Sequence, residues 1–373
     1  MLSMLHKSVE KQKLNSAKFD TSTENTIQIT VDTDSFVAIN NDDGDIAASL
    51  SVKPQERYKF IRSIGFGGMK GVLLVHDNDT NRDVAMALMP DFRNRPQRDL
   101  NRFVREAKIT AKLEHPNIVP VYDIGIDGSG SPFFIMKYLH GQTLATVLHH
   151  KHHKKNDAEF PLERLLQILI RICNAVAFAH SKGICHLDLK PANIICGDYG
   201  EVQVIDWGLA AAGTDDFDTG LMQGTPGYMS PEFIRSKGKE RPGPAADIYA
   251  IGAILYAILA NETPFNGLSP QEILHRQVEG RIPYPSSKNS NVDSGLEAVC
   301  MKALSLDPED RYKSVLEMRR DIFNCLDGYP CKAEKPSFLR RALLFAKRKW
   351  TTLTLLTLAT LVALLALILL FHD

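Results

Sequence analysis

Four polar residues between Ile184 and Gly208 have the types and spacing needed for chemistry on a phosphate group. Asp188, Lys190 and Asn193 lie on one short stretch, and Asp206 follows after two apolar runs separated by a turn. Carboxylate and amide oxygens are ligands that Mg²⁺ accepts, and an ammonium group can neutralise a phosphoryl oxygen. A glycine close to Asp206 allows the backbone to approach a ligand closely. The segment therefore predicts metal-assisted phosphoryl transfer.

These motifs resemble the catalytic loop and the metal-binding turn of the eukaryotic-type serine/threonine protein kinases of bacteria. The run HLDLKPAN corresponds to the family's H-R-D-L-x-x-x-N, and Asp206-Trp207-Gly208 corresponds to D-F-G. Residue types, order and spacing all agree, which a chance turn rich in Asp and Asn would not produce. The resemblance covers about residues 57 to 326, and it implies ATP and Mg²⁺ as cofactors and a protein hydroxyl as the acceptor.

The resemblance implies a role for each of these side chains. Asp188 would orient the acceptor hydroxyl and take up its proton, while Lys190 would neutralise charge on the moving phosphoryl group. Asn193 and Asp206 would hold Mg²⁺. The lysine followed by proline is similar to serine/threonine rather than tyrosine kinases, and so is GTPGYMSPE, in which Thr225 would reach Asp188 and Lys190.

Further residues of the resemblance are structural. Glu232 and Arg311 are expected to form a buried ion pair. Asp247 is expected to accept hydrogen bonds from the backbone at His186 and Leu187, which would fix the catalytic loop to a central helix. Leu187 also stands where the family has an arginine, so no cation beside Asp188 can bind a phosphorylated activation loop. Trp207 replaces the family's Phe.

The Gly-rich segment at the start of the domain departs from the family in one way that matters. Gly65, Gly67 and Gly68 resemble the loop that covers ATP phosphates, which alone is weak evidence. Lys70 occupies the place of the family's third glycine. The lysine of V-A-x-K is absent, because the corresponding strand segment ends in Ala87. A simple interpretation would be an inactive relative.

The pleat of the strands offers another interpretation. Side chains two residues apart share a face, so Lys70 points the same way as Val72, and Ala87 the same way as Ala85. The ammonium group would enter the cleft from the neighbouring strand, where the small Ala87 leaves room for it. This arrangement resembles the with-no-lysine kinases, and it makes Lys70 the phosphate ligand and the partner of Glu106. The alternative is an exposed hairpin lysine and unproductive nucleotide binding.

The residues expected around the adenine rest on the resemblance alone, because each would be ordinary core in any fold. They are Val72 and Ala85 above the ring, Ile195 below it, Met136 at the back, and the backbone amides from Lys137 to Leu139 as hydrogen-bond donors.

The elements that must position these residues form an α+β, two-lobed fold. Residues 57–140 alternate as antiparallel strands and include one helix, Asn101 to Leu113, that carries Glu106. Residues 141–326 are mostly helical. The helices are expected at Thr143 to Lys151, Leu162 to Lys182, Ala245 to Ala260, Ser269 to Glu279, Leu296 to Ala303 and Ser314 to Asn324.

Composition excludes several other classes. Lys plus Arg equals Asp plus Glu, 44 each, so no broad basic face argues for nucleic acid. The six cysteines form no C-x-x-C motif, which favours reduced thiols in the cytoplasm.

The segment from His149 to Lys155 could bind a metal, but a solvated lysine-rich loop is the simpler interpretation. Residues 1–52 are expected to be a disordered arm without a secretory signal, and they contain one short alternating run, Thr26 to Val31.

The last segment has a different character. Thr351 to Phe371 carries no charge and is long enough to cross a bilayer, whereas a buried soluble helix is rarely apolar all round at that length. The preceding linker, residues 327–350, is basic, which places the kinase lobes in the cytoplasm on a single-pass tail anchor. Ala359 and Ala363 have the spacing of a face through which two membrane helices pair, so formation of a homodimer remains one alternative.

Two functions from different classes remain open. The first is a membrane-anchored serine/threonine protein kinase that transfers the γ-phosphate of ATP to protein hydroxyls. The second is a nucleotide-binding pseudokinase that acts as a scaffold at the membrane, favoured by Ala87 and Leu187. The presence of Asp188, Lys190 and the two metal ligands weighs against the scaffold, which needs none of them. The GTPGYMSPE segment disfavours a kinase for small molecules.

Overall fold

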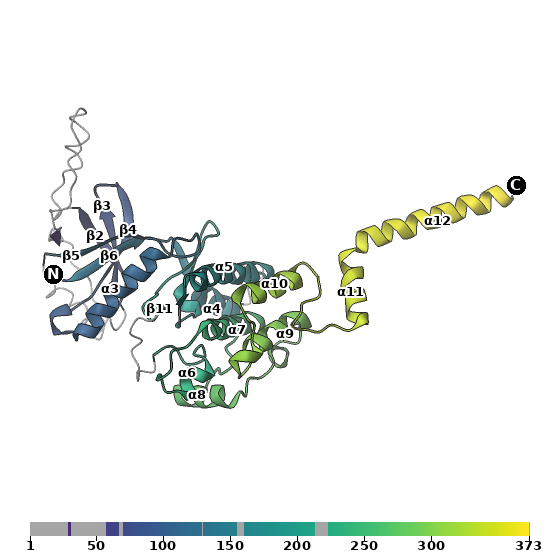
Figure 1. Ribbon diagram of the computed structural model, residues 1–373. Coiled ribbons are helices and arrows are strands. Elements are labelled where there is room, and N and C mark those ends of the chain that lie inside the picture. The colour runs from purple at the N-terminus through teal and green to yellow at the C-terminus, as the bar shows by residue number, and fades with distance from the viewer. Residues whose placement is uncertain are drawn as a thin grey trace. The chain divides into compact units, whose positions relative to one another are not determined.

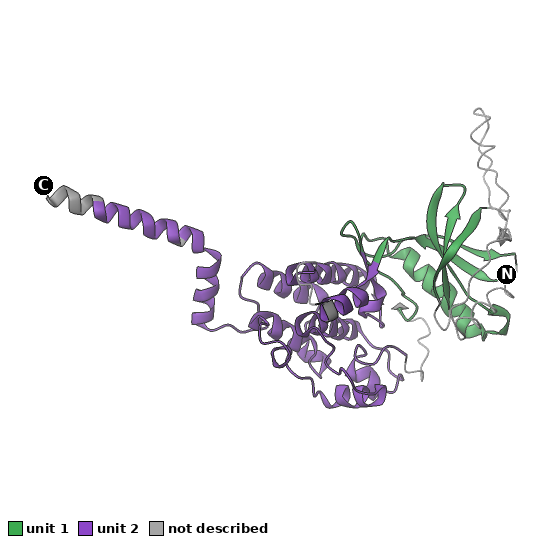
Figure 2. Cartoon of the chain, turned by 180° about the vertical axis from the view of Figure 1, so that it is seen from behind, with its two compact units in different colours: residues 1–141, 197–210 green, residues 142–196, 211–373 purple. Residues whose placement is uncertain are grey.

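The computed structural model describes residues 29–30, 57–66, 70–128, 130–154, 160–212 and 223–372. The chain divides into two compact units, coloured separately in Figure 2. Unit 1 comprises residues 1–141 and 197–210, and unit 2 comprises residues 142–196 and 211–373. The arm expected at residues 1–52 lies outside the described residues, except for a short strand at Ile29–Thr30.

Unit 1 is built on a six-stranded antiparallel sheet with the order β1-β5-β6-β4-β3-β2 (Figure 1). The strands are β1 Ile29–Thr30, β2 Tyr58–Phe66, β3 Gly71–Asp77, β4 Arg82–Leu88, β5 Val121–Asp127 and β6 Pro132–Lys137. The three alternating segments that the sequence predicts as an antiparallel meander are β2, β3 and β4. The strand β1 lies within the alternating run of the N-terminal arm and pairs with β5. The sequence does not predict this pairing.

The two faces of this sheet have different partners. On one face, alternate residues such as Val75, Val84 and Met86 form an apolar cluster. On the other face, Ala87 and its neighbours pack against the helix α3, Gln97–Lys112. That helix begins four residues before the predicted start, because its first turn after Pro96 is polar and carries no apolar periodicity.

Unit 2 is helical, as predicted, and its central helix is apolar all round. The helices up to residue 326 are α4 Leu144–Lys154, α5 Leu162–Ser181, α6 Pro231–Arg235, α7 Pro244–Ala260, α8 Pro270–Glu279, α9 Ser294–Ala303 and α10 Val315–Leu326. The remaining short strands are β7 Gly141–Thr143, β8 Ile184–Cys185, β9 Ile194–Gly197, β10 Val202–Val204 and β11 Ala211–Ala212, of which β10 lies in unit 1. Every residue of α7 from Ala246 to Ala260 is buried, with α5 and α9 packed against the helix. A helix without a polar face needs such cover.

The chain after α10 contains two more helices, α11 Phe338–Arg348 and α12 Trp350–His372. The predicted linker is therefore helical over most of its second half, where the Ser337 hydroxyl accepts a hydrogen bond from the amide of Arg340 and caps α11. Within the described residues, no single helix is long and apolar enough to cross a bilayer. The segment Trp350–Leu365 passes that test only together with α11, across a bend of 74°.

One buried cation ties α6 and the first turn of α7 to the loop before α10. Arg311, whose side chain is fully buried, makes two parallel hydrogen bonds to Glu232, at 2.9 and 2.7 Å. It also donates to the carbonyl oxygens of Ser305 and Ala245, both at 2.9 Å. The ion pair that the sequence predicts is thus present, and it anchors the short helix α6 that follows the GTPGYMS segment.

Replacing Arg311 by leucine should lower the free energy of unfolding by about 3 kcal/mol, because Glu232 and two carbonyl groups lose their donor. The change is measured as the urea midpoint of the helical circular dichroism signal. Arg320→Leu, at an exposed position on α10, is the matched control and should move the midpoint little. Equal midpoints for the two variants would contradict a structural role for the ion pair.

Candidate active site

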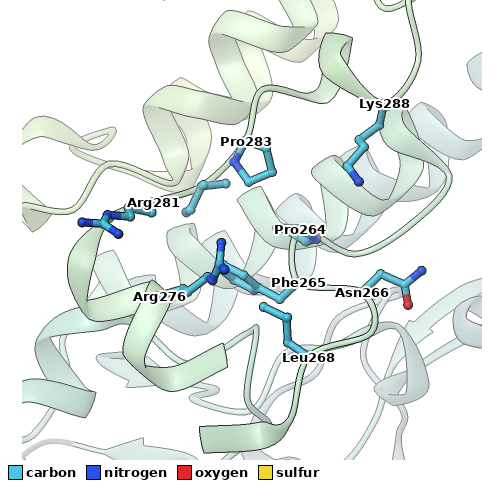
Figure 3. A pocket seen from close by; sticks show the side chains of 10 residues that line it. Pro264, Phe265, Asn266, Leu268, Arg276, Arg281, Pro283 and Lys288 are labelled. Atoms are coloured by element: carbon cyan, nitrogen blue, oxygen red, sulfur yellow. The ribbon is translucent and has the colours of Figure 1, made fainter. Parts of the chain in front are cut away.

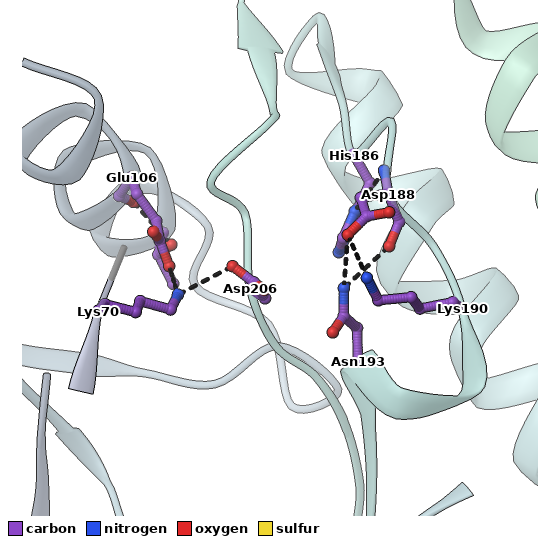
Figure 4. A network of polar contacts seen from close by, with 8 residues as sticks. Lys70, Glu106, His186, Asp188, Lys190, Asn193 and Asp206 are labelled. Carbon is purple, nitrogen blue, oxygen red and sulfur yellow. Dashed lines mark hydrogen bonds and ion pairs between the residues drawn. The ribbon is translucent and has the colours of Figure 1, made fainter. Parts of the chain in front are cut away.

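The first cluster of functional residues lies in unit 1 and centres on Lys70. Its ammonium nitrogen forms a close ion pair with Oε1 of Glu106 and lies 2.8 Å from Oδ1 of Asp206 (Figure 4). Lys70 immediately precedes β3, Glu106 is on α3, and Asp206 follows β10. The contact with Glu106 is the one that the sequence predicts. The second contact, with Asp206, is a finding of the structure.

Strand register explains why a lysine just before β3 can reach Glu106. Val72 pairs with Ala87 and Leu74 pairs with Ala85, so these side chains share one face of the sheet. Lys70 precedes Val72 by two residues and belongs to the same face, which is the face covered by α3. The side chain of Ala87 is fully buried in that cluster. A small residue at this position therefore agrees with a lysine stem arriving from the neighbouring strand.

The electrostatics of the cluster favour a charged lysine. Burial alone lowers the pKa of the Lys70 ammonium, but the carboxylates of Glu106 and Asp206 outweigh it, and the pKa is raised above the ordinary value. Burial raises the pKa of Glu106 to about 6, because the attraction of Lys70 does not fully offset desolvation and the negative charge of Asp206. The cluster of one ammonium and two carboxylates carries a net charge of −1, and it becomes neutral when Glu106 takes up a proton.

Two backbone features position the carboxylates. Asp206 has a positive φ of 68°, which is uncommon for a residue other than glycine and turns the chain sharply after β10. A Cβ atom on Gly208 would lie 3.0 Å from Oε2 of Glu106 and 3.3 Å from Oδ1 of Asp206. Glycine at this position therefore leaves the space that the two carboxylates occupy.

The residues expected around the adenine have mixed outcomes. Val72, Met136 and Leu139 are half-buried, and Ala85 is buried. The backbone amide of Lys137, however, donates to the carbonyl oxygen of Pro120 at 3.1 Å. This amide is therefore already paired within unit 1, and the role of the amides from Lys137 to Leu139 toward a nucleotide stays a prediction.

Two more of these predictions concern the Gly-rich loop and the floor of the site. Gly67 and Gly68 lie outside the described residues. Among the residues that the structure describes, no heavy atom other than those of Gly65 and its chain neighbours lies within 4 Å of a Cβ placed on Gly65. Ile195, on β9 in unit 2, is half-buried.

The second cluster lies in unit 2 and centres on Asp188 (Figure 4). The ammonium of Lys190 donates to Oδ2 of Asp188 at 2.7 Å and to the hydroxyl of Thr225 at 2.8 Å. That hydroxyl donates to Oδ1 of Asp188 at 3.0 Å. The amide nitrogen of Asn193 donates to the carbonyl oxygen of Asp188 at 2.9 Å, which leaves the amide oxygen as the atom suited to a cation. All the predicted contacts of Thr225 are present.

A buried carboxylate holds the loop that carries Asp188. Asp247 accepts hydrogen bonds from the amides of His186 and Leu187, at 2.8 and 2.9 Å, as the sequence predicts. Leu187 has a positive φ of 66°, a conformation that costs energy in a leucine and that these two bonds stabilise. Burial alone raises the pKa of Asp247, but its hydrogen bonds outweigh that effect and the pKa is lowered.

Two supporting residues were missed by the sequence analysis. Nε2 of His180 lies 2.8 Å from Asp247, and the fully buried Gln277 links the amide of Gly227 to the carbonyl of Met229. Both act across long stretches of sequence and carry no local signature. The only sign of Gln277 in the sequence is its place on the amphipathic helix α8.

Residues 58–321 match the family described as the protein kinase domain. The chain belongs to this protein kinase family. It is 38% identical over 288 residues to the serine/threonine-protein kinase PknB of Mycobacterium leprae, an alignment that covers 75% of this chain and 44% of the relative. It is 34% identical over 324 residues to the serine/threonine-protein kinase PknD of Chlamydia trachomatis, which covers 79% of this chain and 33% of that protein. The chain thus spans less than half the length of these curated relatives.

Membership of the protein kinase family agrees with the two polar clusters centred on Lys70 and Asp188. Other candidate sites lie outside these clusters and have no role in the proposed phosphoryl transfer. A pocket in unit 2, lined by Arg276, Arg281 and Lys288 among others, has no carboxylate, thiol or imidazole among its described lining residues (Figure 3). The segment from His149, weighed as a metal-binding loop, belongs to α4 as far as Lys154, so the prediction of a loop there is wrong.

A group of potential metal ligands also lies outside the two clusters, at His180, Cys185 and Asp247. Burial raises the pKa of the Cys185 thiol to about 12, which keeps this group protonated. The oxygens of Asp247 are already taken by the catalytic loop and His180. This group is therefore structural in the kinase domain.

The raised pKa of Glu106 predicts a pH effect on stability. Between its ordinary value of 4.5 and about 6, the native state binds the proton more tightly than the unfolded state, so stability falls as the pH rises through this window. The free energy of unfolding of Glu106→Gln, relative to the unmodified protein, should rise by about 2 kcal/mol from pH 4.5 to 7. Urea titrations at several pH values measure it.

Glu114→Gln, at an exposed position just after the same helix, is the control and should show no such rise. A constant difference between Glu106→Gln and the unmodified protein across this pH range would show that Glu106 is not the group that titrates.

Proposed function

We propose that this chain is an active ATP-dependent protein kinase that phosphorylates serine and threonine hydroxyls of proteins. The observation that carries the proposal is the Asp188 carboxylate, held at once by Lys190 and Thr225 and on a loop fixed by Asp247. In this arrangement Asp188 orients the acceptor hydroxyl and takes up its proton, while Lys190 stabilises negative charge on the transferred group. The relatives from Mycobacterium leprae and Chlamydia trachomatis are named as serine/threonine-protein kinases.

The proposed activity requires ATP and Mg²⁺. The amide oxygen of Asn193 and the carboxylate of Asp206 are hard oxygen ligands, which suit Mg²⁺, and the metal supplies charge neutralisation at the phosphates. Lys70 donates to Oδ1 of Asp206 at 2.8 Å, and its ammonium would turn toward the phosphates if Asp206 held Mg²⁺. Adenine would lie on Val72 and Ala85 with Met136 behind it, and we assign the hinge donor to the amide of Leu139.

Within this proposal, Lys70 replaces the lysine that the family has on the third strand, as in the with-no-lysine kinases. Support comes from its ion pair with Glu106, from its raised pKa and from the small buried Ala87. Leu187 stands where the family has an arginine, so we infer that activity does not depend on a phosphorylated activation loop. The alternative, a nucleotide-binding scaffold without turnover, would leave the charged Asp188 and Lys190 without a function.

Moving the lysine from position 70 to position 87 on β4 tests whether Lys70 binds the phosphates. Lys70→Met should reduce label transfer from radiolabelled ATP to a basic test protein by at least about 100-fold, since the charge on the phosphates is lost. Adding Ala87→Lys in the same chain should restore part of the activity, because both positions share one face of the sheet. Lys59→Met, at an exposed position on β2, is the control.

Asp188→Asn separates the enzyme from the scaffold in the same assay. It should abolish transfer and leave nucleotide binding in place, because Asp188 acts on the acceptor rather than on the adenine. Full label transfer by Lys70→Met would disprove the role of Lys70 and leave the assignment of the chain as a kinase intact. Absence of transfer by the unmodified kinase would favour the scaffold.

We also propose that α12 anchors the kinase domain in a membrane, with its basic flank on the cytoplasmic side. The sequence from Thr351 to Phe371 has no charge, and its described leucines, such as Leu355 and Leu361, are 66% and 67% exposed. Side chains of this kind need an apolar solvent.

Membrane extraction tests the anchor. The full chain should stay in the membrane pellet after washing with alkaline carbonate, whereas a variant with Leu356→Arg, Leu361→Arg and Leu364→Arg should be released, because each buried arginine costs about 3 kcal/mol at the centre of a span. Release of the unmodified chain by carbonate would contradict the anchor without touching the assignment of the kinase site.

A further inference from the structure

The helix α11 has two faces with different surroundings. One face is docked on unit 2: Arg340, Leu344 and Arg348 are spaced four residues apart and therefore lie on one side of the helix. The guanidinium of Arg340 makes hydrogen bonds of 2.8 Å to both Asp293 and Glu334. Leu344 is buried. The docked face fixes α11 to the helical unit.

The docked face ends at Arg348, where the helix meets the loop after α10. The Arg348 guanidinium lies 3.8 Å from the ring centre of Tyr329 and donates to the carbonyl oxygen of Gly328 at 3.3 Å. Cation–π and hydrogen-bond contacts of this kind hold the far end of α11 in place. Both ends of the helix are therefore attached to the same unit.

The opposite face of α11 is apolar and exposed. Phe338 is 85% exposed, Leu339 74%, Leu343 64% and Phe345 51%. Exposed apolar side chains scattered singly need no explanation, but four on one side of an eleven-residue helix form a continuous patch. The amphipathic pattern is that of a helix whose second face has a partner.

The charges around the patch identify the kind of partner. Arg341 lies one turn from Phe338 and Phe345 on one border, and Lys347 lies one turn from Leu343 on the other. No acidic residue occurs between Phe338 and Trp350. An apolar stripe bordered by cations on both sides matches a surface of acyl chains beneath anionic headgroups.

We propose that α11 lies along the cytoplasmic surface of an anionic bilayer, with this apolar face inserted at the boundary of headgroups and acyl chains. The inference rests on the proposed membrane anchor. The bend of 74° between α11 and the apolar helix after it agrees with one helix in the surface and the next entering the bilayer. Because Arg340 and Arg348 clamp the other face, the helical unit is held close to the lipid rather than on a free tether.

Depth-dependent quenching in the full chain tests the inference. The chain is placed in lipid nanodiscs that contain phosphatidylglycerol, with Trp350→Phe, so that buried Trp207 is the constant background. Leu343→Trp adds a fluorescent reporter on the apolar face of α11, and Leu316→Trp adds the control at an exposed position on α10. We expect a blue-shifted emission that brominated lipids quench in the first variant and a water-like, unquenched emission in the second.

Each other outcome overturns the inference in a recognisable way. Unquenched, water-like emission of Leu343→Trp in chains that remain in the disc would refute the surface helix while leaving the anchor intact. Blue-shifted emission without quenching would mean that protein, such as a second copy of this chain, covers the patch. Chains that fail to enter the disc would refute the anchor as well, and the label-transfer assay reports on the kinase site separately.

Discussion

The ion-pair cluster of Lys70, Glu106 and Asp206 is the constraint on which the proposed chemistry depends. In the proposed site, the Lys70 ammonium just before β3 takes the role of the lysine that the family has on the next strand. The small Ala87 leaves space for it, and Gly208 keeps a Cβ away from the carboxylates. Two carboxylates around one buried cation keep that cation charged. In the proposed site, this positive charge would meet the phosphate oxygens of the nucleotide.

The second unit supplies a framework in which backbone conformations of high energy are stabilised by buried polar groups. Asp247 accepts two amide hydrogen bonds at the strained Leu187, and Arg311 fixes Glu232 at the end of the segment that begins with Thr225. Buried charges of this kind contribute little net stability, but loss of one partner is costly. Their contribution is geometric, because they determine where the Asp188 carboxylate points.

The sequence predicted what is encoded in local spacing. The pattern D-x-K-x-x-N locates Asp188, and the period of two in β3 and β4 predicts that Lys70 shares a face with Ala87. Interactions across long distances were found only in part: Gln277 was missed because an isolated polar residue on an amphipathic helix has no signature. The helix α11 was predicted as a linker, because its flanking Gly and Pro residues masked the four-residue spacing of Arg340, Leu344 and Arg348.

The most direct test of the account is chemical labelling of the unmodified kinase with an acyl-phosphate derivative of ATP, which transfers a tag to lysines that touch the phosphates. Mass spectrometry should find the tag on Lys70, and excess ATP should prevent the labelling. A tag on Lys190 together with Lys70 agrees with the proposed site. A tag on Lys190 or on other lysines with Lys70 unmodified would contradict the central role of Lys70.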